Sequence, residues 1–262
     1  MRERVALARC ETYRAEELEP LIHGMFETLG IYDELKPGMT AVLKPNLVMR
    51  AKPEEAVATH PAFVAAVGKC VKKAGAGVLI AESPGGPYAP GLMKAHFKAC
   101  GYTEMAEQNG FSLYTDCKSR EVSLPEGSVC RRLSVVEPFL DAEYLIDLAK
   151  LKTHSMVGFS GAVKNLFGVV PGLQKPELHC RFPEKEEFSQ MLVDLCGLIS
   201  PDLAFLDGIW AMEGDGPTGG SRRELGAVAA SKNPYAADVC AAYLAGIEPA
   251  SVLMLLYGSQ RG

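Results

Sequence analysis

The chain has 262 residues, of which 48% are hydrophobic and 23% charged, with a formal net charge of −5. That is the composition of a soluble globular protein, and the length allows one large domain or two lobes. The acidic balance and the lack of a basic tract exclude nucleic acid as the main partner. We also expect no membrane partner and a cytoplasmic location, because no apolar run reaches the roughly 18 residues that span a bilayer and the N-terminus lacks a signal-peptide pattern.

Apolar runs alternate with helical patterns along the chain. Strands are predicted at Val5–Ala8, Ala41–Lys44, Val78–Glu82, Tyr144–Leu148, Leu203–Leu206 and Ala227–Ala230. Helices are predicted at Ala15–Leu29, Pro61–Ala74, Gly91–Cys100, Glu184–Ile199 and Pro234–Ala245. This order predicts an α/β fold with a mainly parallel or mixed sheet and crossover helices. We expect a single domain over residues 1–262, with lobes of about 1–140 and 141–262 as the alternative.

Three local features add detail to this outline. The stretch from Phe111 to Phe139 is rich in turn residues and suggests an antiparallel flap or an edge hairpin. Thr59, more than His60, is expected to cap the helix that Pro61 opens, and Asn233 to cap the last helix. The cysteines form no C-x-x-C pair, so we expect reduced thiols rather than a metal or cluster site.

Polar residues follow the second and third predicted strands. Lys44 and Asn46 flank Pro45, which ends the second strand, and Glu82 precedes Gly85 and Gly86 after the third. The carboxyl edge of a parallel sheet is where open α/β folds bind ligands. We therefore expect Lys44, Asn46, Glu82 and the two glycines to contact a ligand, although a solvated strand end and a plain turn are the alternatives.

The segment after the fourth predicted strand is the most informative. It places Lys152, His154, Lys164, Asn165 and His179 among several glycines. We predict that His154, Lys164 and His179 face one pocket and are catalytic, and that Lys152 and Asn165 bind the ligand. A lysine held near other cations has a lowered pKa and acts as a nucleophile or base. A solvated basic loop is the alternative.

The loop after the fifth predicted strand carries carboxylates among glycines. Glu213 and Asp215 suit hydrogen bonds to a substrate or a hard cation, and an acidic surface loop is the alternative. We further predict that the loop after Glu82 and the turn before Lys164 aim backbone amides at a shared anion, because glycines there permit close approach.

Several motifs together resemble the family catalogued as domain of unknown function 362. They are KPNLV (Lys44–Val48), THP (Thr59–Pro61), KLKTH (Lys150–His154), GAVKNLFG (Gly161–Gly168) and DGIWAMEGDGPTGG (Asp207–Gly220). Members of the family are often fused to a ferredoxin-like domain with iron–sulfur clusters. This chain stops at Gly262 with no cysteine after Cys240, so we expect such clusters only in a missing domain or a partner subunit, and no cofactor within this chain.

A second set of residues resembles lactate racemase. That family carries H-x-x-x-G-F-S-G-G-x-K, then P-G and a further histidine, and its lysine tethers a nickel pincer cofactor while histidines serve as metal ligand and acid–base groups. His154, Lys164, Pro171 and His179 stand in similar order here, but Ala162 replaces the second glycine. The resemblance implies the fold more than it implies nickel.

These observations leave three functions open. The leading one, implied by the first resemblance, is a redox enzyme or electron-transfer protein acting on a small anionic molecule. The alternatives are an isomerase similar to lactate racemase, with a metal or lysine-linked cofactor, and a non-catalytic anion-binding module. Substrate, reaction type, bound metal and oligomeric state do not follow from the sequence.

Because cluster-ligand spacing is lacking, we predict that this chain alone binds no iron–sulfur cluster. Anaerobic reconstitution with iron and sulfide should give a protein without stoichiometric iron and without visible absorption. A signal from four irons per chain would contradict the prediction.

Overall fold

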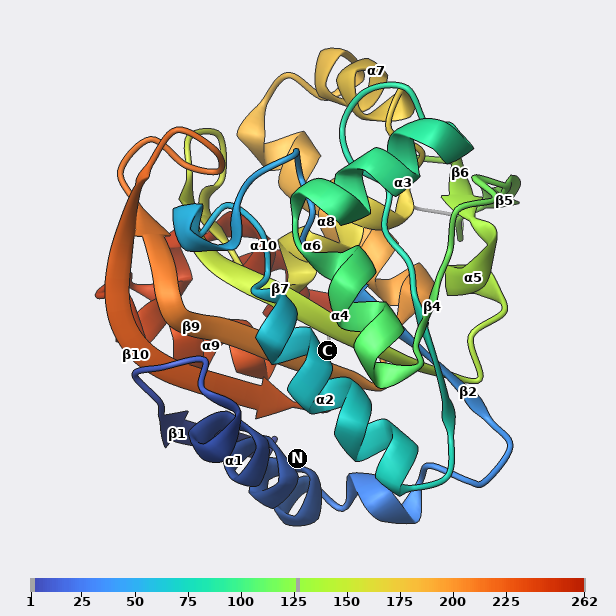
Figure 1. The fold of residues 1–262 in the computed structure, drawn as a ribbon. Helices are drawn as coiled ribbons and strands as arrows, with labels where there is room; N and C mark the ends of the chain where they lie inside the picture. The colour runs from blue at the N-terminus through green and yellow to red at the C-terminus, as the bar shows by residue number, and fades with distance from the viewer. Residues whose placement is uncertain (1–2, 126–127, 262) are drawn as a thin grey trace.

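The computed structural model describes residues 3–125 and 128–261, and most of their strands lie in one mixed eight-stranded sheet (Figure 1). The strand order is β1 (Val5–Arg9), β10 (Ser221–Ser231), β9 (Leu203–Glu213), β7 (Tyr144–His154), β2 (Thr40–Pro45), β3 (Gly77–Ile80) and β4 (Ser112–Leu113), with β8 (Gly158–Ser160) paired to β7. The strands from β9 to β4 are parallel, whereas β10, β1 and β8 run antiparallel to their neighbours. The predicted α/β fold is thus confirmed.

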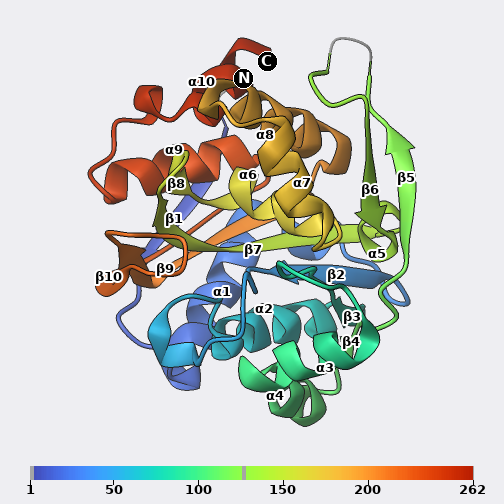
Figure 2. The same ribbon diagram turned by 90° about the horizontal axis from the view of Figure 1, so that it is seen from above.

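Helices cover both faces of the sheet, so the molecule has three layers (Figure 2). One face carries α1 (Ala15–Leu29), α2 (Pro61–Lys73), α3 (Pro90–Ala99) and α4 (Tyr102–Asn109). The other carries α6 (Ala162–Asn165), α7 (Gln174–Arg181), α8 (Lys185–Ile199), α9 (Pro234–Leu244) and α10 (Leu253–Arg261). Each helical layer buries its apolar side against the sheet and forms its own core, with Phe26, Phe63 and Phe205 in the first and Phe159 and Phe188 in the second.

Short elements complete the described chain. A separate antiparallel pair, β5 (Ser119–Ser123) and β6 (Arg132–Val136), leads into α5 (Glu137–Leu140), and this is the hairpin expected from the turn-rich stretch. Single 3-10 turns lie at Ile31–Asp33, Pro53–Glu55, Leu166–Val169 and Pro249–Ser251. No helix among the described residues is long and apolar enough to cross a membrane. Both halves of the chain contribute strands to the one sheet, while the division into lobes stays a prediction.

The predicted strands are real, but three of them extend at least six residues beyond their predicted bounds. β7 continues through the polar segment up to His154, and β9 and β10 form a long antiparallel pair.

One capping prediction is wrong: His60, not Thr59, caps α2, because its Nδ1 accepts a hydrogen bond from the Ala62 amide. Asn233 caps α9 as predicted, accepting hydrogen bonds from two amides of the first turn.

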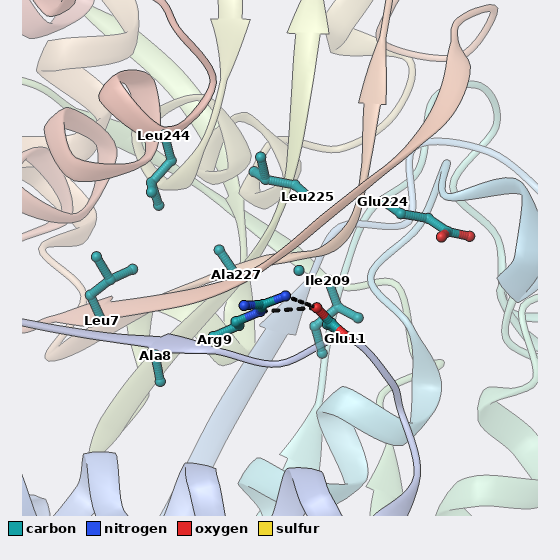
Figure 3. Close-up of a pocket in the computed structure, with 10 residues that line it drawn as sticks. Leu7, Ala8, Arg9, Glu11, Ile209, Glu224, Leu225, Ala227 and Leu244 are labelled. Atoms are coloured by element: carbon teal, nitrogen blue, oxygen red, sulfur yellow. Dashed lines mark hydrogen bonds and ion pairs between the residues drawn. The ribbon is translucent and has the colours of Figure 1, made fainter.

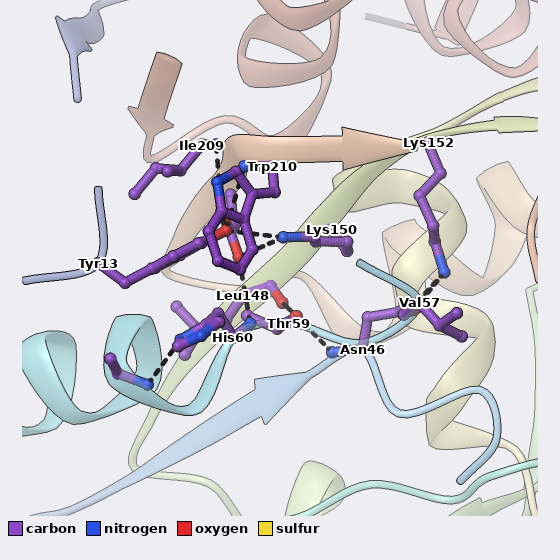
Figure 4. A network of polar contacts seen from close by, with 12 residues as sticks. Tyr13, Asn46, Val57, Thr59, His60, Leu148, Lys150, Lys152, Ile209 and Trp210 are labelled. Carbon is purple, nitrogen blue, oxygen red and sulfur yellow. Dashed lines mark hydrogen bonds and ion pairs between the residues drawn. The ribbon is translucent and has the colours of Figure 1, made fainter. Parts of the chain in front are cut away.

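A buried ion pair ties β7 and β9 to the loop before α1 (Figure 4). Lys150 and Asp207 are register partners on the two strands, and their side chains are fully buried with Nζ and Oδ2 2.9 Å apart. The Tyr13 hydroxyl donates to Asp207 at 2.7 Å and accepts from Lys150 at 2.8 Å. The Tyr13 ring also stacks on His60, with ring centres 3.8 Å apart, and Trp210 contacts both rings edge-on.

Removing one partner of this pair should be costly, because it leaves a buried charge unpaired. We expect Lys150→Met to lower the free energy of unfolding by about 3–5 kcal/mol, measured by urea denaturation. The matched control is Lys69→Met, which breaks the exposed pair with Glu19 and should cost at most about 1 kcal/mol. Equal losses in the two variants would contradict a structural role for the Lys150–Asp207 pair.

Candidate functional site

A cavity of about 260 Å³ lies at the carboxyl ends of β2, β3 and β7. The three strands are neighbours in the sheet, and α6 and α7 close the cavity on one side. Its lining includes the predicted residues His154, Lys164 and His179, together with Asn46, Glu82, Gly85 and Asn165. The wall is completed by Leu47, Val48, Ser83, Phe167, Gly168, Lys175, Pro176 and Pro217. The fold thus gathers side chains that are far apart in the sequence.

Two lysine amines share one aromatic wall of this cavity. The Nζ atoms of Lys164 and Lys175 lie 4.9 and 5.9 Å from the centre of the Phe167 ring, and both side chains are half-buried. Burial, aided by the charge of Lys44, lowers the pKa of Lys164 to about 8. Burial also lowers the pKa of Lys175 to about 7. The charge of Glu82 opposes this shift, whereas the charges of Lys44 and Lys164 add to it. Both amines therefore titrate close to neutral pH.

The two lysines differ in their partners. Lys175 donates a short hydrogen bond to the Ser83 carbonyl oxygen. Within the part of the chain that the structure describes, Lys164 Nζ makes no hydrogen bond and no ion pair. Lys164 thus presents to the cavity an amine that no described protein group holds, and its protonated form favours an anionic ligand.

The two histidines at the cavity are held in the neutral form. Burial and the charges of Lys164 and its neighbours lower the pKa of His154 to about 3, and burial with Lys164 and Lys175 lowers that of His179. Nδ1 of His154 accepts hydrogen bonds from the amides of Met156 and Val157, so the ring proton of the neutral form lies on Nε2. His179 stacks on Phe188 with ring centres 4.5 Å apart.

A buried ion pair forms the floor of the site. Lys44 Nζ lies 2.7 Å from Glu82 Oε2, and the side chains are 0% and 4% exposed. Gly168 closes over this pair, since a Cβ atom there would come within 2.1 Å of Glu82 Oε1 and 2.6 Å of Lys44 Nζ. Lys44 is thus paired with Glu82 beneath the cavity and does not line it.

A chain of hydrogen bonds runs beneath the cavity from β7 to α6. Lys152 Nζ donates to Asn46 Oδ1 at 2.7 Å, Asn46 Nδ2 donates to Asn165 Oδ1 at 2.9 Å, and Asn165 Nδ2 donates to Asp147 Oδ1 at 2.7 Å. Lys152 also donates to the carbonyl oxygens of Val57 and Pro217, so its three donors are used. Lys152 and Asn165 therefore hold the site together, and Lys152 does not reach the ligand space.

The backbone amides at the start of α6 are not free to bind an anion. The amides of Ala162 and Val163 donate to the two carboxylate oxygens of Asp238 on α9, at 2.6 and 3.0 Å. The Gly85 amide donates to the Val48 carbonyl at 3.3 Å. For these three amides, the prediction that the two segments bind a shared anion is therefore wrong, because protein acceptors already satisfy them. Side-chain cations are the groups left to meet an anion.

The carboxylates of the β9–β10 loop also lie elsewhere. Glu213 and Asp215 are exposed, and Glu213 pairs with Arg223 at 3.7 Å. The loop reaches the cavity through Pro217 instead. Gly86 does not line the cavity, but its carbonyl would lie 2.3 Å from a Cβ atom at position 172, so glycine is needed there for the loops to meet. The predicted ligand-binding role of Glu213 and Asp215 therefore does not fit their position.

Sequence reasoning missed two polar residues of the cavity. Lys175 lies four positions before His179 on α7, a spacing that puts both on one helix face, but the helix itself was not predicted. Its Pro176 falls in the first turn, where a missing N–H costs little. Ser83 directly follows Glu82 and is fully buried, and no local signal separates it from an ordinary loop serine.

A wider concavity of about 710 Å³ lies at the β1 edge of the sheet, between β1, β10 and the end of α9 (Figure 3). Apolar side chains such as Leu7, Leu225 and Leu244 line it, and its charged residues Arg9 and Glu11 are exposed and pair with each other. The smaller cavity gathers lysines and histidines that are at least half-buried, so it is the better candidate for chemistry.

The cavity offers limited means of holding a metal cofactor. Lys164 supplies an amine for attachment, and His154 and His179 supply imidazoles, one of which already uses Nδ1 as an acceptor. Within residues 3–125 and 128–261, no three His, Cys, Asp or Glu side chains gather as metal ligands. A nickel cofactor therefore stays a prediction from resemblance.

The chain is thus an α/β protein with a cavity at the carboxyl ends of its parallel strands, and lysines and histidines line that cavity. Similarity to known proteins defines the family. Residues 41–243 match the family described as Domain of unknown function (DUF362), and the chain belongs to that family. It is 34% identical over 250 residues to a thylakoid-associated protein of Synechocystis sp., an alignment that covers 95% of this chain and 76% of the relative.

The fold is similar to that of the lactate racemase apoprotein from Thermoanaerobacterium thermosaccharolyticum. The TM-score is 0.53 at 16% sequence identity, and the match covers 90% of this chain but only 56% of that protein. A Thermotoga maritima protein of known crystal structure matches with a TM-score of 0.47 at 12% identity, over 97% of this chain and 60% of that one. The expected likeness of fold to lactate racemase is confirmed, and it extends to the fold alone.

The buried Asp147 gives a testable pH dependence. Burial raises its pKa to about 8, so the folded chain binds a proton there that the unfolded chain has lost. The stability contributed by this group is present at acidic pH and is lost as pH rises through about 8. Asp147→Asn removes that loss while keeping the Asn165 contact. We expect its free energy of unfolding, relative to that of wild type, to be at least about 1.4 kcal/mol higher at pH 9 than at pH 5.

Urea denaturation at the two pH values measures the difference. The exposed Asp116 provides the control, since Asp116→Asn should shift stability equally at both pH values. A variant at position 147 that loses stability at pH 9 would show instead that the carboxylate is charged and needed.

Proposed function

We propose that the cavity binds a small organic anion and that the chain is an enzyme which uses the Lys164 amine for proton transfer. The observation that carries the proposal is the gathering of Lys164, Lys175, His154 and His179 around one cavity of about 260 Å³. Perturbed pKa values that cluster in a cleft mark functional sites, because structural charges are normally paired. An unpartnered lysine facing a cavity is the exception here, since Lys44, Lys150 and Lys152 are all satisfied by protein groups.

The size and lining of the cavity indicate the kind of ligand. The volume suits a small molecule rather than a nucleotide, and Leu47, Val48 and Phe167 offer apolar contact for a short carbon skeleton. The two lysines provide the charge that would hold a carboxylate or phosphate group. A lysine with a pKa near neutral pH can accept a proton from a bound molecule, and the neutral His154 can donate a hydrogen bond from Nε2.

Two other functions remain proposals of lower rank. An isomerase similar to lactate racemase would use the same Lys164 and histidines, and the shared fold makes it compatible with the proton transfer proposed here. The redox or electron-transfer interpretation, with a ferredoxin-like partner, rests on the resemblance described under Sequence analysis. The cytoplasmic location likewise stays a prediction. One relative, the Synechocystis protein, is described as thylakoid-associated.

Anion affinity should depend on the cavity lysines and on pH. We expect pyruvate, titrated by calorimetry at pH 6, to bind at least about tenfold more weakly to Lys164→Met than to wild type, because a charge-assisted contact is lost. Affinity should also fall as pH rises from 6 to 9, since Lys175 and Lys164 lose their protons near pH 7 and 8.

The exposed Lys185 at the start of α8 is the matched control, and Lys185→Met should bind as wild type does. Equal affinities for the 164 and 185 variants would refute the proposal. If pyruvate does not bind, inorganic phosphate serves as the second probe, and failure of both anions would end the idea of an anion site.

A further inference from the structure

We infer that Lys164 is a nucleophile that forms an imine with small carbonyl compounds carrying an anionic group, such as 2-oxo acids. This inference rests on the proposed function and goes further, because it names a covalent step and a substrate class. Phe167, Lys175, Ser83 and His154 line the same cavity as the Lys164 amine.

The first observation is the position of the amine. Lys164 is the third residue of α6, and its Nζ lies over the Phe167 ring without a hydrogen-bond partner among the described residues. Asp238 fixes α6 by accepting from two of its amides, so the helix that carries Lys164 is held against α9. A nucleophile must be positioned and free of competing contacts, and Lys164 meets both conditions.

The second observation is that Lys164 and Lys175 differ in how their amines are held. Lys175 lies over the same ring and donates to the Ser83 carbonyl, so its amine is held in place. When Lys175 is protonated, an anionic group can pair with it. The Lys164 amine has no such anchor and is free to meet the carbonyl carbon of the same molecule.

The third observation is an unused hydroxyl. Ser83 lines the cavity and is 0% exposed, yet its Oγ has no hydrogen-bond partner within the described chain. A buried polar atom without a partner costs free energy unless a ligand or water satisfies it. Ser83 Oγ and His154 Nε2–H are the donors available to the oxygen of a bound carbonyl compound.

The chemistry balances without an oxidant or a metal. The neutral Lys164 amine attacks the carbonyl carbon, so a C–N bond forms and the C=O π bond breaks. The nitrogen loses a proton and the oxygen gains one, giving a carbinolamine. The C–O bond then breaks and the oxygen leaves as water with a second proton, so that one amine and one carbonyl give one imine and one water. Burial beside other cations is the environment that activates lysines for this step.

Reductive trapping tests the inference on the whole chain. Wild-type protein is incubated at neutral pH with pyruvate and sodium cyanoborohydride, which reduces an imine to a stable secondary amine, and the modified lysine is located by peptide mass mapping. We expect at least about tenfold more adduct at Lys164 than at exposed lysines such as Lys185, because the Lys164 amine loses its proton more readily. Acetone, a carbonyl probe without an anionic group, should label Lys164 much less, and phosphate should protect it.

Two variants and the binding data separate the outcomes. Lys164→Arg keeps the charge but cannot form the imine, so it should lose the adduct, while Lys185→Arg should keep it. Adduct spread over surface lysines or found at Lys175 would overturn the inference, as would equal labelling by acetone and pyruvate. Pyruvate binding without an adduct would overturn the imine alone, whereas loss of anion binding in calorimetry would remove the proposed function as well.

Discussion

The cost of burying charge at the carboxyl ends of β2, β3 and β7 is the constraint on which the site depends. Lys44 and Glu82 meet this cost by pairing with each other beneath the cavity. Because the pair fills the space below the 3-10 turn at Leu166–Val169, the turn must pass over it with glycine at 168. The pair therefore fixes the distance between the sheet and the segment that carries Phe167, and with it the depth of the cavity.

The lysines near the site fall into two groups, those on the strand β7 and those on the helices α6 and α7. Lys150 and Lys152 point to the same side of β7, and each is buried with oxygen acceptors from neighbouring segments. These contacts bind the sheet to the loops above it. Lys164 and Lys175 come from α6 and α7 and line the cavity, where Lys175 donates to the Ser83 carbonyl and Lys164 has no hydrogen-bond partner among the described residues. Lysines on the strand thus stabilise the framework, whereas lysines on the helices line the cavity.

The sequence placed the polar site residues at one edge of the sheet, because parallel strands share one carboxyl edge and polar residues follow three of the predicted strands. It located His154, Lys164 and His179 at one site for the same reason. It did not predict that β7 extends through Lys150 and Lys152, since alternating charged residues do not resemble a buried strand. Neither could it reveal Asp238, whose contact with α6 spans 75 positions of the chain and leaves no local pattern. Asp147 stood in an apolar strand and could have been noticed as a buried carboxyl.

The contact between Asp238 and the start of α6 has a consequence for how this domain can be divided. The family match ends at residue 243, within α9 and shortly after Asp238. A fragment that ended before α9 would still encode His154, Lys164 and His179, yet it would lack the carboxylate that holds the helix bearing Lys164. Conversely, Tyr13 lies before the matched range and still hydrogen-bonds Lys150. The smallest autonomous unit is therefore larger than the set of residues around the cavity, and a graft of the cavity onto another sheet would have to bring both distant segments with it.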